Sequence, residues 1–69
     1  MEDRKLKNTL KVQRAMNNLT QEQLAELVGV TRKTINTVEN GIYIPSTYLA
    51  LKLSMALNVS VEELFQLCD

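Results

Sequence analysis

The segment from residue 21 to residue 40, QEQLAELVGVTRKTINTVEN, constrains the fold more than any other part of the chain. Its apolar residues recur at helical spacing on both sides of Gly29, which predicts two helices of about eight residues joined by a three-residue turn. Ala25 is small where the two helices must cross closely, and Gly29 adopts the positive φ of a sharp turn at little cost. Ile35 and Val38 lie three residues apart and face the core. The segment therefore predicts a tight pair of short helices.

Capping residues predict where three of the helices begin. Thr20 with Gln23, and Ser60 with Glu63, each have the spacing of a capping box. Thr31 is also a favourable N-cap, but it has no acidic partner three residues later. We therefore expect the first backbone N–H groups of the helix after Thr31 to be less covered by side chains and free to face an anion.

The N-terminal part of the chain also has helical spacing and shows no alternating strand pattern. We expect a first helix over residues 4–17, with Leu6, Leu10 and Gln13 on its inner face. The helix would end at Asn17-Asn18, because asparagine tolerates the left-handed conformation of a C-terminal cap.

The C-terminal part predicts two more helices. One begins after Pro45 with Ser46 as its cap and ends at Asn58, and the other follows Ser60 and turns Phe65 and Cys68 inward. The predicted fold class is therefore all-α: a compact five-helix domain in which residues 1–69 form a single unit, since 69 residues leave no room for a second domain.

Composition excludes several classes of function. The chain has no histidine and one cysteine, Cys68, which excludes an internal disulfide, a Cys/His zinc site and an imidazole base. It also lacks a glycine-rich phosphate loop, so we expect no enzyme, no metal and no cofactor. One free thiol, no signal peptide and no apolar run near the roughly 20 residues of a membrane span predict a cytoplasmic protein.

The charge is balanced overall but unevenly distributed. Residues 4–33 hold seven basic and two acidic side chains, whereas the rest of the chain holds one basic and six acidic. A protein polarised in this way can bind a polyanion through its positive side. The zero net charge favours a binder that needs aligned, specific contacts.

The outward face of the helix after Thr31 carries the groups that recognise DNA bases. Lys33, Asn36, Thr37 and Asn40 fall opposite the core residues, and Arg32 lies in the first turn. Arginine or lysine recognises guanine, asparagine recognises adenine, and threonine contacts the thymine methyl group. A polar helix face is often only solvated surface, but here it has no acid and follows the tight turn. Together these features predict a helix-turn-helix.

Three stretches of the sequence resemble the Cro/C1-type helix-turn-helix proteins of phage repressors and small bacterial or archaeal regulators. They are LTQEQLAELVGVTRKTINTVENG at 19–41, Pro45-Ser46, and LKLSMALNVSVEELF at 51–65, so the resemblance covers about residues 10–65. It implies a lambda-repressor-like fold whose third helix enters the major groove of DNA. It also implies that the start of the second helix holds a phosphate.

The resemblance implies a role for each matching position. Arg32, Lys33 and Thr37 would face bases, with Asn36 beside them, while Gln21 would bond the DNA backbone and brace the third helix. The Asn40 side chain and the Gly41 backbone would meet phosphate. The expected DNA-binding residues are Gln21, Thr31, Arg32, Lys33, Asn36, Thr37, Asn40, Gly41 and Tyr43.

Two further residues are implied to be structural. An ion pair between Arg14 and Glu39 would tie the first helix to the third. The chain departs from the family at Gln13, where leucine is usual, so this polar side chain must find a partner.

The loop of residues 41–44 is apolar, and its role has two interpretations. The Tyr43 hydroxyl can bond a phosphate, or Tyr43 and Ile44 simply cover the edge of the core. Two outward apolar stripes also have two interpretations, as self-association surfaces or as packing between helices: Val12 with Met16, and Tyr48 with Leu51 and Met55.

These observations predict a sequence-specific regulator that binds double-stranded DNA. We expect a repressor that binds a palindromic operator as a homodimer. The alternative is an antitoxin or another protein-interaction module with the same fold, whose partner would be a protein such as a toxin.

Overall fold

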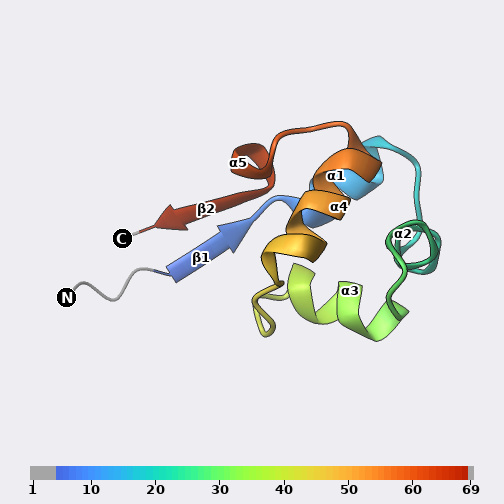
Figure 1. The fold of residues 1–69 in the computed structure, drawn as a ribbon, viewed down its shortest axis with the longest axis horizontal. Helices are drawn as coiled ribbons and strands as arrows, with labels where there is room; N and C mark the ends of the chain where they lie inside the picture. The colour runs from blue at the N-terminus through green and yellow to red at the C-terminus, as the bar shows by residue number, and fades with distance from the viewer. Residues whose placement is uncertain (1–4, 69) are drawn as a thin grey trace.

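The computed structural model describes residues 5–68, which form five helices and two strands (Figure 1). In chain order they are β1 (Lys5–Asn8), α1 (Leu10–Met16), α2 (Gln21–Val28), α3 (Arg32–Glu39), α4 (Thr47–Leu57), α5 (Val61–Leu64) and β2 (Phe65–Cys68). The helices pack around one core, and the two strands project side by side from one end of the helical cluster.

The core is built from the apolar positions that recur at helical spacing. Every helix contributes at least one buried side chain. The buried residues are Leu10, Leu24, Ala25, Val28, Ile35, Val38, Leu49, Leu53, Leu57 and Leu64. At about 25 cal/mol for each Å² of apolar surface removed from water, these side chains supply the main favourable term in folding.

Both predicted capping boxes are confirmed. The Thr20 hydroxyl accepts from the Gln23 backbone N–H at 3.0 Å, and the Gln23 side chain accepts from the Thr20 N–H at 2.8 Å. Ser60 and Glu63 exchange the same two bonds, both at 3.1 Å. These bonds set where α2 and α5 begin, since they satisfy N–H groups that have no partner inside the helix.

Positive φ angles occur where the sequence predicted chain reversals. Gly29 has φ 76° at the end of α2, and Asn18 and Asn58 have φ 57° and 56° after α1 and α4. Asparagine therefore fills two left-handed positions where glycine is the commoner residue.

The all-α prediction is wrong at the two ends of the chain. Strand β1 pairs with β2 in antiparallel register, with Lys5 opposite Cys68 and Asn8 opposite Phe65. The first helix therefore begins at Leu10, and the fifth ends at Leu64 and does not continue to Cys68. The predicted start of the first helix at residue 4 lies outside the described residues.

Side-chain chemistry explains where β1 stops. The Asn8 side chain accepts from the Leu10 N–H at 3.0 Å, which closes a turn between strand and helix. Leu6 and Leu10 lie four positions apart, a spacing that suits one face of a helix and also one face of a strand. The spacing alone therefore did not exclude β1.

The predicted inner face of the first helix is only partly correct. Leu10 is fully buried, whereas Gln13 is half-buried. The Gln13 side chain makes no hydrogen bond to another described residue, so the expectation that it must find a partner is wrong. It is not fully buried, and within residues 5–68 no buried side-chain nitrogen or oxygen lacks a hydrogen bond. Val12 and Met16 are exposed, as predicted.

Candidate nucleic-acid interface

Helix α3 lies across α2, with one face buried and the other open to solvent. Ile35 and Val38 are buried against the core. On the other face, Arg32, Lys33, Asn36 and Asn40 are exposed and Thr37 is half-buried. The structure therefore brings the five predicted side chains of α3 together on its outward side.

The one acidic residue of α3 is withdrawn from this face. The side chain of Glu39 is 3% exposed and pairs with Arg14, whose Nε lies 2.6 Å from Oε2. The ion pair between α1 and α3 that the resemblance implied is confirmed. Since the carboxylate is covered and paired, the outward charges of α3 are those of Arg32 and Lys33.

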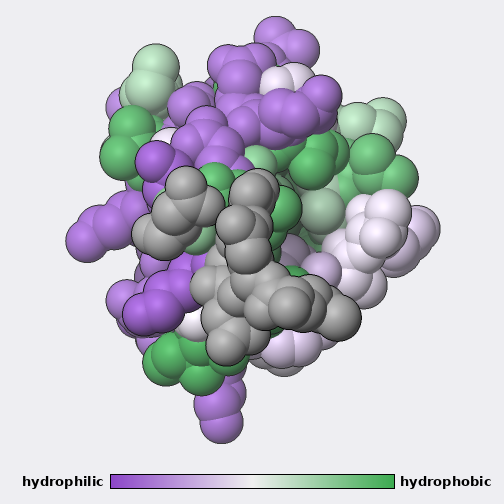
Figure 2. Space-filling model, turned by 90° about the vertical axis from the view of Figure 1, so that its left-hand side faces the viewer, coloured by the Kyte–Doolittle hydropathy of each residue, from purple (hydrophilic) through white to green (hydrophobic). Residues whose placement is uncertain are grey.

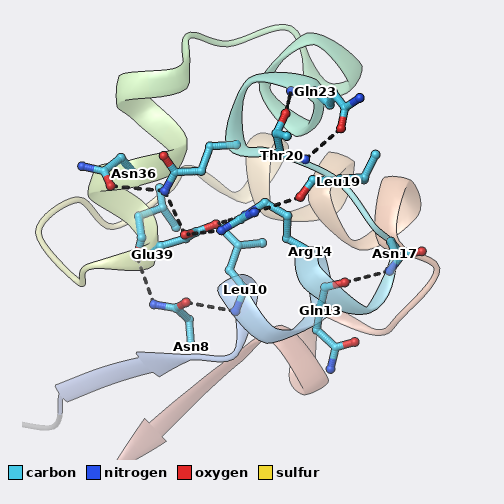
Figure 3. Close-up of polar contacts among 12 residues, drawn as sticks. Asn8, Leu10, Gln13, Arg14, Asn17, Leu19, Thr20, Gln23, Asn36 and Glu39 are labelled. Carbon is cyan, nitrogen blue, oxygen red and sulfur yellow. Dashed lines mark hydrogen bonds and ion pairs between the residues drawn. The ribbon is translucent and has the colours of Figure 1, made fainter.

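Arg14 also connects α1 to the start of α2. Its Nη1 donates to the backbone carbonyl of Leu19 at 2.8 Å, one residue before the cap of α2 (Figure 3). One guanidinium thus fixes the positions of three helices relative to each other.

Gln21 joins the first turn of α2 to α3. Its Nε2 donates to Oε1 of Glu39 at 3.0 Å and to Oδ1 of Asn36 at 3.2 Å. The bracing contact that the resemblance implied for Gln21 is therefore present. The first backbone N–H groups of α2, at Gln21 and Glu22, have no partner among the residues described.

Two threonines complete hydrogen bonds within α3. The Thr31 hydroxyl caps the helix by accepting from the Thr34 N–H at 3.3 Å, and no acid lies in the first turn, as predicted. The Thr37 hydroxyl donates to the Thr34 carbonyl at 2.9 Å. Its hydrogen is therefore already engaged within the helix, and the methyl group is the part of the side chain left for an apolar contact.

The loop after α3 is held by its backbone. The Thr37 carbonyl accepts from the N–H groups of Ile42 and Tyr43, at 2.9 and 3.2 Å. Gly41 has φ 73°, and its own N–H donates to the Val38 carbonyl at 3.1 Å. The loop conformation is therefore set without buried side chains.

The apolar loop does not cover the core. Ile42 and Ile44 are 76% and 70% exposed, and neither is among the side chains packed against the core. Tyr43 is half-exposed and shares a shallow hollow with Lys33 and Thr37. Tyr43 also lines a second hollow with the core residues Val28 and Leu49, so its position fits both interpretations.

Sequence reasoning missed Asn8 as a residue that holds the interface. Its Nδ2 donates to the carbonyl of Val38 at 3.0 Å, so it fixes the last turn of α3 as well as the start of α1 (Figure 3). An asparagine just before a helix is a recognised capping signal. It was hidden because the predicted first helix already included residue 8.

The described residues contain no group of three or more metal-ligating side chains. In the same part of the chain, no helix has both the length and the apolar character that a membrane span requires.

A tight two-helix unit whose second helix presents an acid-free polar face defines the class of helix-turn-helix DNA-binding domains. The chain belongs to the Cro/C1-type helix-turn-helix family: residues 10–64 match the family described as Helix-turn-helix. The protein is therefore a transcriptional regulator with a helix-turn-helix DNA-binding domain.

Relatives of similar length have the same family name. The chain is 48% identical over 60 residues to an uncharacterized HTH-type transcriptional regulator, MJ0272, of Methanocaldococcus jannaschii, covering 87% of this chain and 91% of that protein. It is 45% identical over 62 residues to the uncharacterized HTH-type transcriptional regulator YgzD of Bacillus subtilis, covering 90% and 94%.

A solved structure shows the same architecture. The restriction-modification controller protein C.AhdI from Aeromonas hydrophila superposes with a TM-score of 0.73 at 37% identity, over 78% of each chain. The similarity supports a lambda-repressor-like fold extended by a small antiparallel strand pair.

Proposed function

We propose that the protein represses transcription by binding a palindromic operator as a homodimer, with α3 in the major groove of each half-site. The observation that carries this proposal is the acid-free outward face of α3, where Arg32 and Lys33 are exposed and Glu39 is buried in an ion pair. Arg32, Lys33 and Thr37 would contact base edges.

Backbone phosphates would be bound around this face. The free N–H groups at the start of α2, the Thr31 hydroxyl and the Tyr43 hydroxyl are suited to hold them. The Asn40 amide and the Gly41 N–H already donate within the protein, so the phosphate contacts that the resemblance implied for them are not part of this proposal.

Exposed apolar surface supports association with a second copy. Tyr48, Leu51 and Met55 form a ridge on α4, and Met55 is 82% exposed. Beside the ridge, residues of β1, α4, α5 and β2 line a groove of about 200 Å³, among them Leu6 and Phe65. Figure 2, which faces the end where the strands project, shows that hydrophobic areas are exposed between hydrophilic ones on this side of the molecule.

A two-fold dimer through α4 and α5 suits a palindromic site. An isologous interface repeats the same surface on both subunits, so the ridge of one copy would enter the groove of the other. The two α3 helices would then lie about 34 Å apart, one turn of DNA. Sedimentation at micromolar concentration measures the mass; a monomer that stays monomeric on operator DNA contradicts the dimer.

Repression requires only that the dimer occupies its operator. A bound dimer blocks access of other proteins to the same DNA, and we place this activity in the cytoplasm, as the sequence predicted. The alternative of an antitoxin with a toxin partner is not favoured, since the matched relatives are named transcriptional regulators.

The placement of α3 in the major groove of DNA is tested by removing the two cations on its outward face. Arg32→Ala and Lys33→Ala should each weaken operator binding by about 1–3 kcal/mol and relax the base preference. Lys11→Ala is the matched control, because Lys11 is an exposed lysine of α1; any loss there should be equal for all sequences. Fluorescence anisotropy with operator and scrambled duplexes measures both effects. Unchanged operator binding by both α3 variants contradicts the proposal.

A further inference from the structure

Five side chains from α1, α2, the body of α3 and its C-terminal cap form one continuous chain of hydrogen bonds. Arg14 donates to Glu39, Gln21 donates to both Glu39 and Asn36, and Asn40 donates to Asn36. The chain begins at the buried carboxylate and ends on the exposed side of α3.

The charged end of this chain determines which atom of each amide points where. A guanidinium only donates hydrogen bonds and an ionised carboxylate only accepts them. The atom of Gln21 that faces Glu39 is therefore its amide nitrogen, and the second hydrogen of that nitrogen points at Asn36. The atom of Asn36 on this side must then be the oxygen.

The contacts of Asn40 require the same orientation of the Asn36 amide, with its oxygen toward Asn40. The Asn40 Nδ2 donates to the backbone carbonyl of Asn36 at 2.9 Å and to Oδ1 of Asn36 at 3.2 Å. Both hydrogens of this amide are thereby engaged, so the atom that Asn40 leaves free is its oxygen.

The two polar atoms of the Asn36 amide therefore differ in whether they have hydrogen-bond partners. Its Oδ1 accepts two hydrogen bonds, which fill both lone pairs, whereas its Nδ2 has no partner among the described residues. Gln21 and Asn40 have used both hydrogens of their amides and keep only an oxygen free. Asn36 is thus the one amide of these three that can still donate.

We propose that Asn36 contacts DNA only as a hydrogen-bond donor and selects a base that presents a keto oxygen, guanine or thymine. Asparagine usually recognises adenine by accepting from N6 with its oxygen while donating to N7. The filled Oδ1 of Asn36 cannot accept from the amino group of adenine or cytosine. Adenine therefore offers the free Nδ2 only its N7 and places an amino group beside this donor. Guanine offers two acceptors, O6 and N7, to the free Nδ2.

This inference rests on the proposed function, since it requires α3 to lie in the major groove. Gln21 and Asn40 are then positioning residues: they act on base choice through Asn36. Their removal should change which base is preferred, a property that would not follow from a merely structural role.

The experiment begins with selection of bound duplexes from a random library by the wild-type protein. The position that loses its base preference in Asn36→Ala identifies the contacted base pair. Dissociation constants are then measured for operators that carry each of the four bases there. The wild type should bind the guanine or thymine operator about tenfold more tightly than the adenine operator.

Each of two variants frees a different lone pair of the Asn36 Oδ1. Gln21→Met removes one donor at similar side-chain length, and Asn40→Ala removes the other. In each, the preference over adenine should fall below about threefold, because Oδ1 can then accept from N6. Gln13→Met is the matched control: it makes the same exchange at another half-buried glutamine and should leave the preference unchanged.

The outcomes separate this inference from the proposed function. A wild type that prefers adenine at this position, an Asn36→Ala variant that alters no position, or variants that both keep the full preference would overturn the inference while DNA recognition stands. Failure of the wild-type protein to select any duplex would overturn the proposed function and this inference with it.

Discussion

The two ends of the molecule are stabilised in different ways. At one end, α2 and α3 bury Leu24, Val28, Ile35 and Val38 and are tied together by side-chain hydrogen bonds around Glu39. At the other end, β1 and β2 contain no buried residue and are joined by a backbone ladder. An isolated two-stranded ribbon is marginal in water. We therefore expect stability to reside in the packed helices, which include the interface, and not in the strand pair.

The largest effect should come from the buried carboxylate. Glu39→Ala leaves the Arg14 guanidinium without its partner and should lower the free energy of unfolding by about 3 kcal/mol, since removal of one member of a buried pair is strongly destabilising. Urea denaturation followed by circular dichroism measures the change.

A double variant shows whether the loss comes from the unpaired charge. Arg14→Met combined with Glu39→Leu removes both charges and should be more stable than Glu39→Ala alone. A loss below about 1 kcal/mol in Glu39→Ala would contradict the idea that this end is held by the network.

An intermediate effect is expected at Asn8, which joins the two ends. Asn8→Ala removes the acceptor for the Leu10 N–H and the donor to the Val38 carbonyl, and should cost about 1–2 kcal/mol. Asn8→Ser keeps a capping hydroxyl and should lose less. Urea denaturation gives the two costs, and amide hydrogen exchange shows whether the last turn of α3 opens more often. Equal stability of Asn8→Ala and the wild type would show that the ends are independent.

The helices that carry the interface were predictable because their signals are local. The capping residues Thr20 and Ser60 lie three positions from their partners, and the Gly29 turn needs a conformation that few residues adopt. The outward face of α3 followed from helical periodicity alone, because the buried positions Ile35 and Val38 determine which side remains open.

The strand pair was not predictable from local signals. Strand β1 pairs with a segment at the far end of the chain, and its Leu6 suits a helix as well as a strand. Pairing across such a distance depends on how the helices bring the two termini together.

The site was predictable as a set of residues but not as a network. The ion pair of Arg14 with Glu39 came from the family resemblance, and the face of α3 came from periodicity. The hydrogen bonds from Gln21 and Asn40 to Asn36 depend on side-chain rotamers and on the crossing of two helices. Neither quantity can be obtained from residue spacing.

The smallest effect should come from the strand pair. Leu67 lies opposite Leu6 but is 64% exposed, so Leu67→Thr removes little buried surface and keeps a residue that favours strands. We expect the free energy of unfolding of the monomer to change by less than about 0.5 kcal/mol. Urea denaturation at low protein concentration measures it without any contribution from self-association. A loss above about 1 kcal/mol would mean that the projecting strands stabilise the monomer, and the contrast between the two ends would then be wrong.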